Sequence, residues 1–130
     1  MTTATRRVKK FNNMESAAWK WMRYTGVLML PLVWGHVLIQ DIVVGVHAID
    51  NAYVLQRWSN IFWQVYDILL LGFTFAHGVN GLRQVVNDFV HTQRARNILG
   101  WVFLVFWAVV TVIGAWALIA VGQANLAAQL

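Results

Sequence analysis

The chain has 130 residues, of which 59% are hydrophobic, and it contains eight tryptophans but a single proline. A soluble domain of this size has too much surface for its volume to hide so much apolar area, so this composition excludes an ordinary soluble domain. The absence of cysteine excludes disulfides, thiolate ligands for iron–sulfur clusters and a cysteine nucleophile in this chain. The formal net charge of +5 does not indicate nucleic-acid binding, because the basic residues flank apolar segments, as membrane-orienting charges do.

The chain begins with a polar, basic stretch, residues 1–20, that lacks the early apolar region and the cleavage site of a secretory signal. We expect this stretch to form a cytoplasmic tail or a helix on the membrane surface.

Three apolar segments follow, at about residues 22–46, 61–86 and 97–122. Each is long enough to cross the hydrocarbon layer of roughly 30 Å, which takes about 20 residues. Only helices satisfy their own backbone hydrogen bonds in lipid, so the predicted fold is an all-α membrane protein with three transmembrane helices. We expect residues 1–130 to form a single membrane domain, with Pro31 kinking the first span.

The basic residues predict the orientation of the three spans. Only Arg57 lies in the first connection, and none follows Gly122. The others precede the first span or lie between the end of the second span and the start of the third: Arg6, Arg7, Lys9, Lys10, Lys20, Arg23, Arg83, Arg94 and Arg96. Because Lys and Arg concentrate on the cytoplasmic side, we predict that the N-terminus is inside and the C-terminus outside.

Ionisable groups inside a span are costly, so each is a functional hypothesis. His77 stands out because Asn80, Gly81, Gln84 and Asp88 share its helical face. A neutral imidazole in lipid is a good axial ligand for haem iron, and Gly81 would let a flat macrocycle approach the backbone. The alternative is a hydrogen-bonded histidine and a glycine that serve only to pack helices together.

Residues 77–89, HGVNGLRQVVNDF, resemble the H-x-x-x-G-x-R-x-x-x-x-D signature of a known family. This family is the smaller of the two hydrophobic cytochrome b membrane anchors of bacterial succinate dehydrogenase, or complex II. As in that family, the signature closes the second of three spans and a basic connection follows. The segments WMRYTGVLML and YVLQRWSNIFWQVYD are also similar to such anchors, and the resemblance covers about residues 19–122.

The resemblance implies a multi-pass component of succinate:quinone oxidoreductase in the bacterial cytoplasmic membrane. Such an anchor pairs with a second cytochrome b anchor subunit and docks an iron–sulfur subunit and a flavoprotein subunit on the cytoplasmic side. Electrons from succinate pass through FAD and iron–sulfur clusters in those partners to quinone, which connects the tricarboxylic acid cycle to the respiratory chain. The anchor alone does not oxidise succinate. A haem b lies between the two anchors, with one axial histidine from each.

The resemblance also implies roles for individual residues. His77 corresponds to the ligand of the haem iron, Gly81 to a haem-packing position and Asp88 to the quinone site. Phe89 stands where the family often has a tyrosine that donates to a quinone carbonyl, so a partner subunit would have to supply that donor. Arg83 is a candidate for contact with a haem propionate, with anchoring at the membrane surface as the alternative.

Arg23, at the start of the first span, faces the same choice as Arg83. His36 lies in the middle of that span and fits relatives with two haems, in which each anchor gives a histidine from its first and second spans. The alternative for His36 is a hydrogen bond to a neighbouring helix. One haem or two, ubiquinone or menaquinone, and succinate oxidation or fumarate reduction are all consistent with the sequence.

Two carboxylates, Asp41 and Asp67, are predicted toward the outer side. They fit a proton path, a polar cluster with Tyr66, or interfacial positions at the ends of spans. With His36 they would also fit a small proton-conducting or transporter subunit without haem, which is the main competing function. A purely structural scaffold would leave His77 and Asp88 without a role.

Four further residues receive structural interpretations. We interpret His47 and His91 as interfacial side chains, and Trp107 and Trp116 as packing residues against lipid or a haem edge.

Overall fold

The computed structural model describes residues 13–130, with side chains described from Ser16 onward, and all regular structure in this range is helical. Helix α1 (Asn13–Val37) continues into a π-helix, η1 (Leu38–Gly45), and a short 3₁₀ turn, η2 (Val46–Ala48). Helices α2 (Asn51–Ser59), α3 (Ile61–Phe89) and α4 (Gln93–Ala127) follow.

Three helical segments are long and apolar enough to cross a membrane, which confirms the predicted number of spans. They cover Ser16–Ala48, Ile61–Phe89 and Gln93–Ala127, with lengths of 33, 29 and 35 residues. Each exceeds the roughly 20 residues that a bilayer requires, so the helices tilt or project beyond the hydrocarbon. Residues 13–20, expected in a tail or surface helix, form the first turns of α1, and residues 1–12 lie outside the described part.

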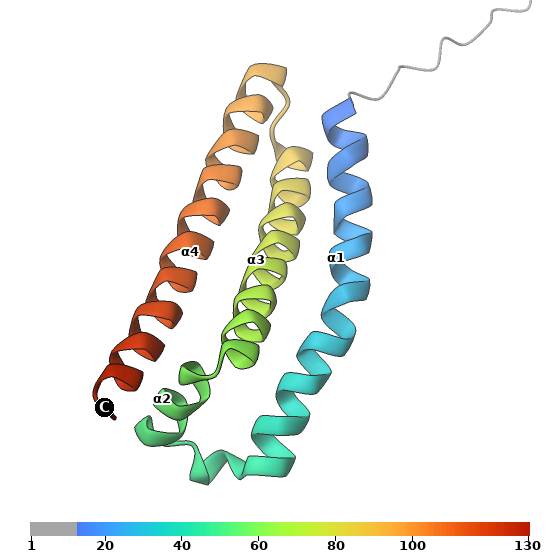
Figure 1. The fold of residues 1–130 in the computed structure, drawn as a ribbon. Helices are drawn as coiled ribbons and strands as arrows, with labels where there is room; N and C mark the ends of the chain where they lie inside the picture. Colours follow the sequence, from blue (N-terminus) through green and yellow to red (C-terminus); the bar gives the residue numbers. More distant parts are fainter. Residues whose placement is uncertain (1–12) are drawn as a thin grey trace, which may run out of the picture.

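Pro31 lies inside α1, which remains α-helical for six further residues before it widens into the π-helix at Leu38. Proline has no N–H, so the carbonyl one turn earlier loses its helical donor. Figure 1 shows the lower part of α1 leaning toward α2. Gly45 has a φ of +82°, which is favourable only for glycine, and it ends the π-helix before the 3₁₀ turn η2.

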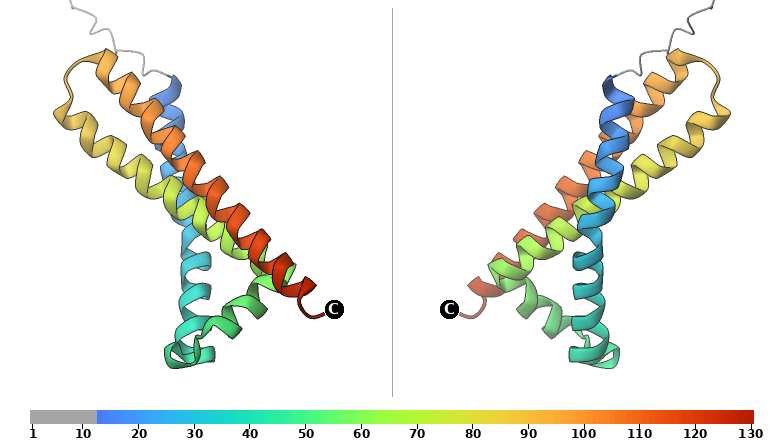
Figure 2. Two further views of the ribbon diagram at one scale, coloured as in Figure 1. Left: turned by 90° about the vertical axis from the view of Figure 1, so that its left-hand side faces the viewer. Right: turned by 90° about the vertical axis from the view of Figure 1, so that its right-hand side faces the viewer.

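Helix α3 lies between the other two long helices. Helix α4 runs antiparallel beside it, while α1 contacts its other side and crosses the α3–α4 pair (Figures 1 and 2). Trp107 of α4 donates its indole N–H to the Gly72 carbonyl of α3 over 3.0 Å. The start of α1, the end of α3 and the start of α4 share one end of the bundle, and the C-terminus lies at the other (Figure 1).

Helix α2 was not predicted from the sequence. Asp50 caps it by accepting a hydrogen bond from the Tyr53 amide (2.8 Å), and Asn60 caps α3 in the same way through the Phe62 amide (2.9 Å). Against α4, the side chain of Asn125 donates to the Ser59 hydroxyl over 2.7 Å. Gly122 of α4 is buried against the Trp58 carbonyl, where no Cβ would fit. These contacts fix α2 across the ends of α3 and α4.

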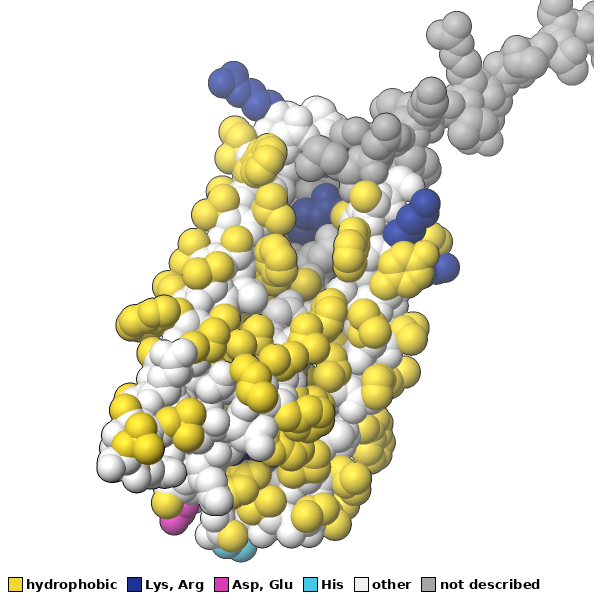
Figure 3. Space-filling model, in the orientation of Figure 1, with side chains coloured by type: hydrophobic (Ala, Val, Ile, Leu, Met, Phe, Trp, Pro, Cys, Tyr) yellow, Lys and Arg dark blue, Asp and Glu magenta, His cyan; other side chains and the backbone are white. Residues whose placement is uncertain are grey.

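The described surface is apolar over most of its length, and large hydrophobic side chains are exposed on every long helix. Among the described residues, the buried ones are mainly polar or small: Thr25, Arg57, Gln64, Gly122 and the apolar Leu118. Figure 3 shows hydrophobic side chains between a basic upper end and a lower end with acidic and histidine side chains. This pattern fits a molecule whose outer surface meets lipid or another apolar partner.

Candidate functional site

His77 lies on the side of α3 that faces α1, where its Nδ1 is 3.3 Å from the Thr25 hydroxyl oxygen. Its other nitrogen, Nε2, makes no hydrogen bond to any described residue. Thr25 is one of the most buried residues, and its hydroxyl donates to the Trp21 carbonyl over 2.7 Å. The imidazole is therefore held at one nitrogen and free at the other.

Gly26 makes room for the same imidazole. A Cβ built on Gly26 would lie 3.3 Å from Cε1 and 3.7 Å from Nδ1 of His77, which is tighter than ordinary van der Waals contact for the nearer atom. The glycine lets the ring edge lie against the backbone of α1. Thr25 and Gly26 thus form a cradle for one edge of His77.

The helical face predicted to contain His77 lies against α1, and three other residues of this face also contact α1. Asn80 donates to the Ala18 carbonyl over 2.7 Å, and the Gln84 amide lies 3.2 Å from the Met22 sulfur. A Cβ at Gly81 would lie 3.2 Å from the Met22 methyl carbon. The small surface at Gly81 is therefore covered by a flexible methionine of the same chain.

His36 lies much farther toward the other end of the bundle. It is eleven residues beyond Thr25, the neighbour of His77, which corresponds to about 16 Å along α1. Its Nδ1 is buried without a hydrogen-bond partner among the described residues. At this level α1 and α3 approach closely, because a Cβ at Gly35 would lie 2.8 Å from the Tyr66 hydroxyl, which itself donates to the Leu32 carbonyl.

The two candidate arginines lie at the basic end of the bundle. The guanidinium of Arg23 is exposed and stacks on Trp19, with its central carbon 3.6 Å from the ring centre. Arg83 donates through Nε to the Asn80 side chain over 3.2 Å. Neither forms an ion pair within the described part of the chain, so each can receive an anionic partner.

Asp88 and Phe89 end α3, and both side chains are exposed at the basic end of the bundle. Asp88 forms no ion pair with a described residue. The neighbouring Asn87 has a buried side-chain oxygen that no described donor reaches. Nearby, His91 has its Nδ1 2.8 Å from the Phe89 carbonyl.

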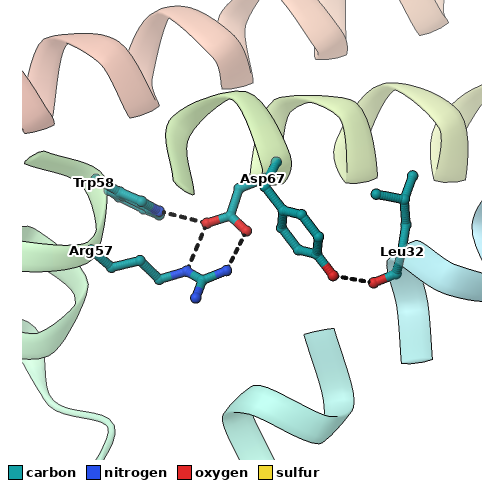
Figure 4. A network of polar contacts seen from close by, with 5 residues as sticks. Leu32, Arg57, Trp58 and Asp67 are labelled. Atoms are coloured by element: carbon teal, nitrogen blue, oxygen red, sulfur yellow. Dashed lines mark hydrogen bonds and ion pairs between the residues drawn. The ribbon is translucent and has the colours of Figure 1, made fainter. Parts of the chain in front are cut away.

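At the opposite end, Arg57 and Asp67 form the one ion pair among the described residues. Two hydrogen bonds join them, from Nε over 3.0 Å and from Nη2 over 2.8 Å, and the Trp58 indole donates to the same carboxylate over 3.2 Å (Figure 4). The guanidinium carbon lies 4.0 Å from the centre of the Trp63 ring. Burial lowers the pKa of Arg57, but the hydrogen bond and attraction from Asp67 more than offset this and raise it above its ordinary value.

The expected polar cluster of Asp67 with Tyr66 is therefore not formed through a hydrogen bond between these two residues. Asp67 binds Arg57 and Trp58, whereas the Tyr66 hydroxyl donates to the Leu32 carbonyl. Sequence reasoning placed Arg57 only in a connection and missed its role. The one available signal was an arginine ten residues before an intramembrane aspartate.

Comparison with known proteins identifies the family. The profile of the succinate dehydrogenase/fumarate reductase transmembrane subunit matches residues 2–113, which is most of the chain. The chain belongs to this family. Among curated proteins, no match to the chain is found.

The protein is thus a transmembrane anchor subunit of succinate dehydrogenase/fumarate reductase, an oxidoreductase complex, and it associates with other subunits of complex II. The competing interpretation as a proton-conducting or transporter subunit is weakened, because Asp67, one of the residues proposed for a proton path, forms an ion pair with Arg57. Asp41 and His47 are exposed near the turn after α1, and Trp116 is exposed on α4. These positions agree with interfacial and packing roles.

Within the described residues, this anchor subunit has no cluster of three histidine, cysteine, aspartate or glutamate side chains able to enclose a metal ion. His77 and His36 also lie at different depths. Because of this difference in depth, a haem bound by His77 could not also be bound by His36. Its second axial ligand would come from outside these two residues.

Proposed function

We propose that this chain is the smaller hydrophobic anchor of its complex, that it binds haem b jointly with a second cytochrome b anchor subunit, and that His77 supplies one axial ligand. The observation that carries the proposal is the state of the imidazole. Nδ1 is held by Thr25 on the side of α3 that faces α1, whereas Nε2 has no hydrogen-bond partner among the described residues. Such a nitrogen is a suitable ligand for haem iron, and bound haem would accept and pass on single electrons.

The residues around His77 fit a bound haem. Thr25 and Gly26 seat the ring edge, while the guanidinium groups of Arg23 and Arg83, which form no ion pair with a described residue, suit the propionates. Gly81 can pack against the macrocycle if the flexible Met22 side chain moves aside. Because one histidine cannot complete six-coordinate iron, the second axial ligand comes from the partner anchor.

His36 is the candidate ligand of a second haem. Its depth, about 16 Å beyond the level of His77, rules out a shared iron. The buried Nδ1 without a described partner leaves a polar atom whose burial is costly and which a bound group or partner side chain would satisfy.

We further infer that Asp88 and Phe89 belong to the quinone site at the basic end of the bundle. Quinone reduction takes up two protons with two electrons, and an exposed carboxylate at the membrane surface can pass protons from water. Phe89 offers only an apolar wall, so the donor to a quinone carbonyl comes from a partner subunit.

The basic end of the bundle is proposed to face the cytoplasm of a bacterial cell, with residues 1–130 acting as one anchor domain. The iron–sulfur and flavoprotein subunits bind at this end. The iron–sulfur clusters belong to the iron–sulfur subunit, because this chain has no cysteine to ligate a cluster. FAD belongs to the flavoprotein subunit.

Replacing His77 tests the proposed function. In the purified complex, His77→Ala should abolish the haem absorbance or reduce it strongly, because no other described histidine lies at this depth. His47→Ala is the matched control, since His47 is exposed outside the candidate site. Haem is quantified as its pyridine complex. A His77→Ala complex with the wild-type haem content and spectrum would contradict the proposal.

A further inference from the structure

Thr25 makes an unusual set of contacts for a hydroxyl in an apolar helix. The residue is 3% exposed, and its hydroxyl oxygen lies 2.7 Å from the Trp21 carbonyl, 3.2 Å from the Met22 carbonyl and 3.3 Å from Nδ1 of His77. A threonine back-bonding to its own helix needs only the first of these contacts. The third connects α1 to the candidate haem ligand on α3.

The direction of the hydrogen bond to His77 follows from the chemistry of these partners. Carbonyl oxygens can only accept, and the Trp21 carbonyl is the nearest partner, so the single hydroxyl proton of Thr25 points to it. The Thr25 oxygen then faces His77 as an acceptor. Nδ1 of His77 must therefore carry the ring proton, which leaves a lone pair on Nε2.

We propose that Thr25 is a positioning residue that fixes the tautomer and orientation of His77, so that Nε2 is presented to haem iron. This assignment rests on the proposed haem function and adds a residue to it. Histidines that bind metals generally donate their second N–H to an oxygen acceptor, which makes the ligating nitrogen more basic. The hydroxyl of Thr25 is itself polarised by its bond to Trp21, which strengthens this effect.

Gly26 supports the same geometry through shape. A Cβ at this position would lie 3.3 Å from Cε1 of His77, the ring atom between the two nitrogens, so the imidazole would have to shift from its present position. The adjacent Thr25 and Gly26 thus combine a hydrogen-bond acceptor with space for the ring edge.

The test removes the hydroxyl while it preserves the shape of the side chain. In the purified complex, Thr25→Val should lower the affinity for haem by about 10–100-fold, measured as transfer to an excess of a haem-scavenging protein. It should also raise the haem midpoint potential, because a less basic ligand stabilises ferric iron less well. Thr25→Ser retains the hydroxyl and should preserve both wild-type values.

Thr111→Val is the matched control, because Thr111 lies on α4 and its hydroxyl oxygen has no described partner. Wild-type affinity and potential in Thr25→Val would overturn the assignment, as would Thr25→Ser shifting them as far as Thr25→Val does. If Thr25→Val fails to assemble, Thr25→Ala takes its place against Thr25→Ser under the same criteria. A wild-type complex without haem overturns the proposed function itself, and is thereby distinguished from failure of the Thr25 assignment alone.

Discussion

The two intramembrane histidines differ in how their ring nitrogens are used. His77 has one nitrogen bound to Thr25, which leaves the second as the chemically available one. His36 has a buried Nδ1 that no described group satisfies, a state that costs about 1–3 kcal/mol until a partner arrives. His77 is thus oriented by a residue of this chain, whereas no described residue of the chain orients His36 through Nδ1.

Asp88 offers a residue-level test of the quinone site. Asp88→Asn preserves the size of the side chain but removes its ability to accept and release protons. We expect quinone reduction by the purified complex to fall about 100-fold, the scale of a lost acid–base group, while the haem content stays at the wild-type level. The measurement is the steady-state rate of succinate-dependent quinone reduction.

The control for this variant is Asp41→Asn. Asp41 is also an exposed carboxylate, but it lies in η1, near the opposite end of the bundle. If Asp88→Asn reduced quinone as fast as Asp41→Asn, the proton-transfer role of Asp88 would be lost.

Sequence spacing was sufficient to place residues on a shared helical face, but not to identify their partners. The period of the helix correctly grouped His77, Asn80, Gly81 and Gln84, because i+3, i+4 and i+7 positions recur on one side. Thr25 lies 52 residues from His77 in the sequence. Their contact depends on how α1 and α3 are aligned along their axes, which periodicity within one helix does not specify.

At the level of the elements, the sequence predicted the long helices better than the short one. Apolar runs located all three spans because membrane thickness sets a minimum length. The helix ends extended beyond the predictions, since polar turns remain helical outside the hydrocarbon. Helix α2 carries no apolar run of that kind, and its position depends on caps and tertiary contacts made by Asp50, Arg57 and Asn125.

The attachment of α2 to α3 depends on the pair of Arg57 and Asp67. Their side chains are only 4% and 13% exposed, so Asp67→Asn leaves a buried guanidinium without its counter-charge. Breaking a buried pair from one side costs about 3–5 kcal/mol. We expect Asp67→Asn to lower the thermal unfolding midpoint of the purified complex clearly.

Two further variants show whether a loss of stability in Asp67→Asn comes from the broken ion pair. Asp41→Asn, which changes an exposed carboxylate, should remain within about 0.5 kcal/mol of wild type. The double variant Arg57→Met/Asp67→Leu removes both charges and should recover much of the lost stability. An Asp67→Asn complex as stable as wild type would show that the pair does not hold α2 in place.

For the molecule as a whole, the distribution of basic residues agrees with the arrangement of the helix ends. Three crossings put the two ends of the described chain at opposite ends of the bundle (Figure 1). Nine of the ten Lys and Arg residues precede the apolar part of α1, lie in the last two turns of α3 or lie in the first turn of α4. The described ones among them lie at one end of the bundle: Lys20, Arg23, Arg83, Arg94 and Arg96. From the positive-inside rule we therefore expect this end to face the cytoplasm.

The lack of cysteine makes this orientation directly measurable with single-cysteine variants. Gln93→Cys marks the start of α4 and Gln129→Cys marks the other end, and both glutamines are exposed. In cells whose cell envelope is permeable to the reagent but whose cytoplasmic membrane is intact, a membrane-impermeant maleimide should label Gln129→Cys alone. Gln93→Cys should become labelled only after detergent lysis, with the cysteine-free chain as the blank. Labelling of Gln93→Cys from outside would contradict the proposed orientation, and with it the proposed cytoplasmic location of the quinone site at Asp88 and of the iron–sulfur subunit.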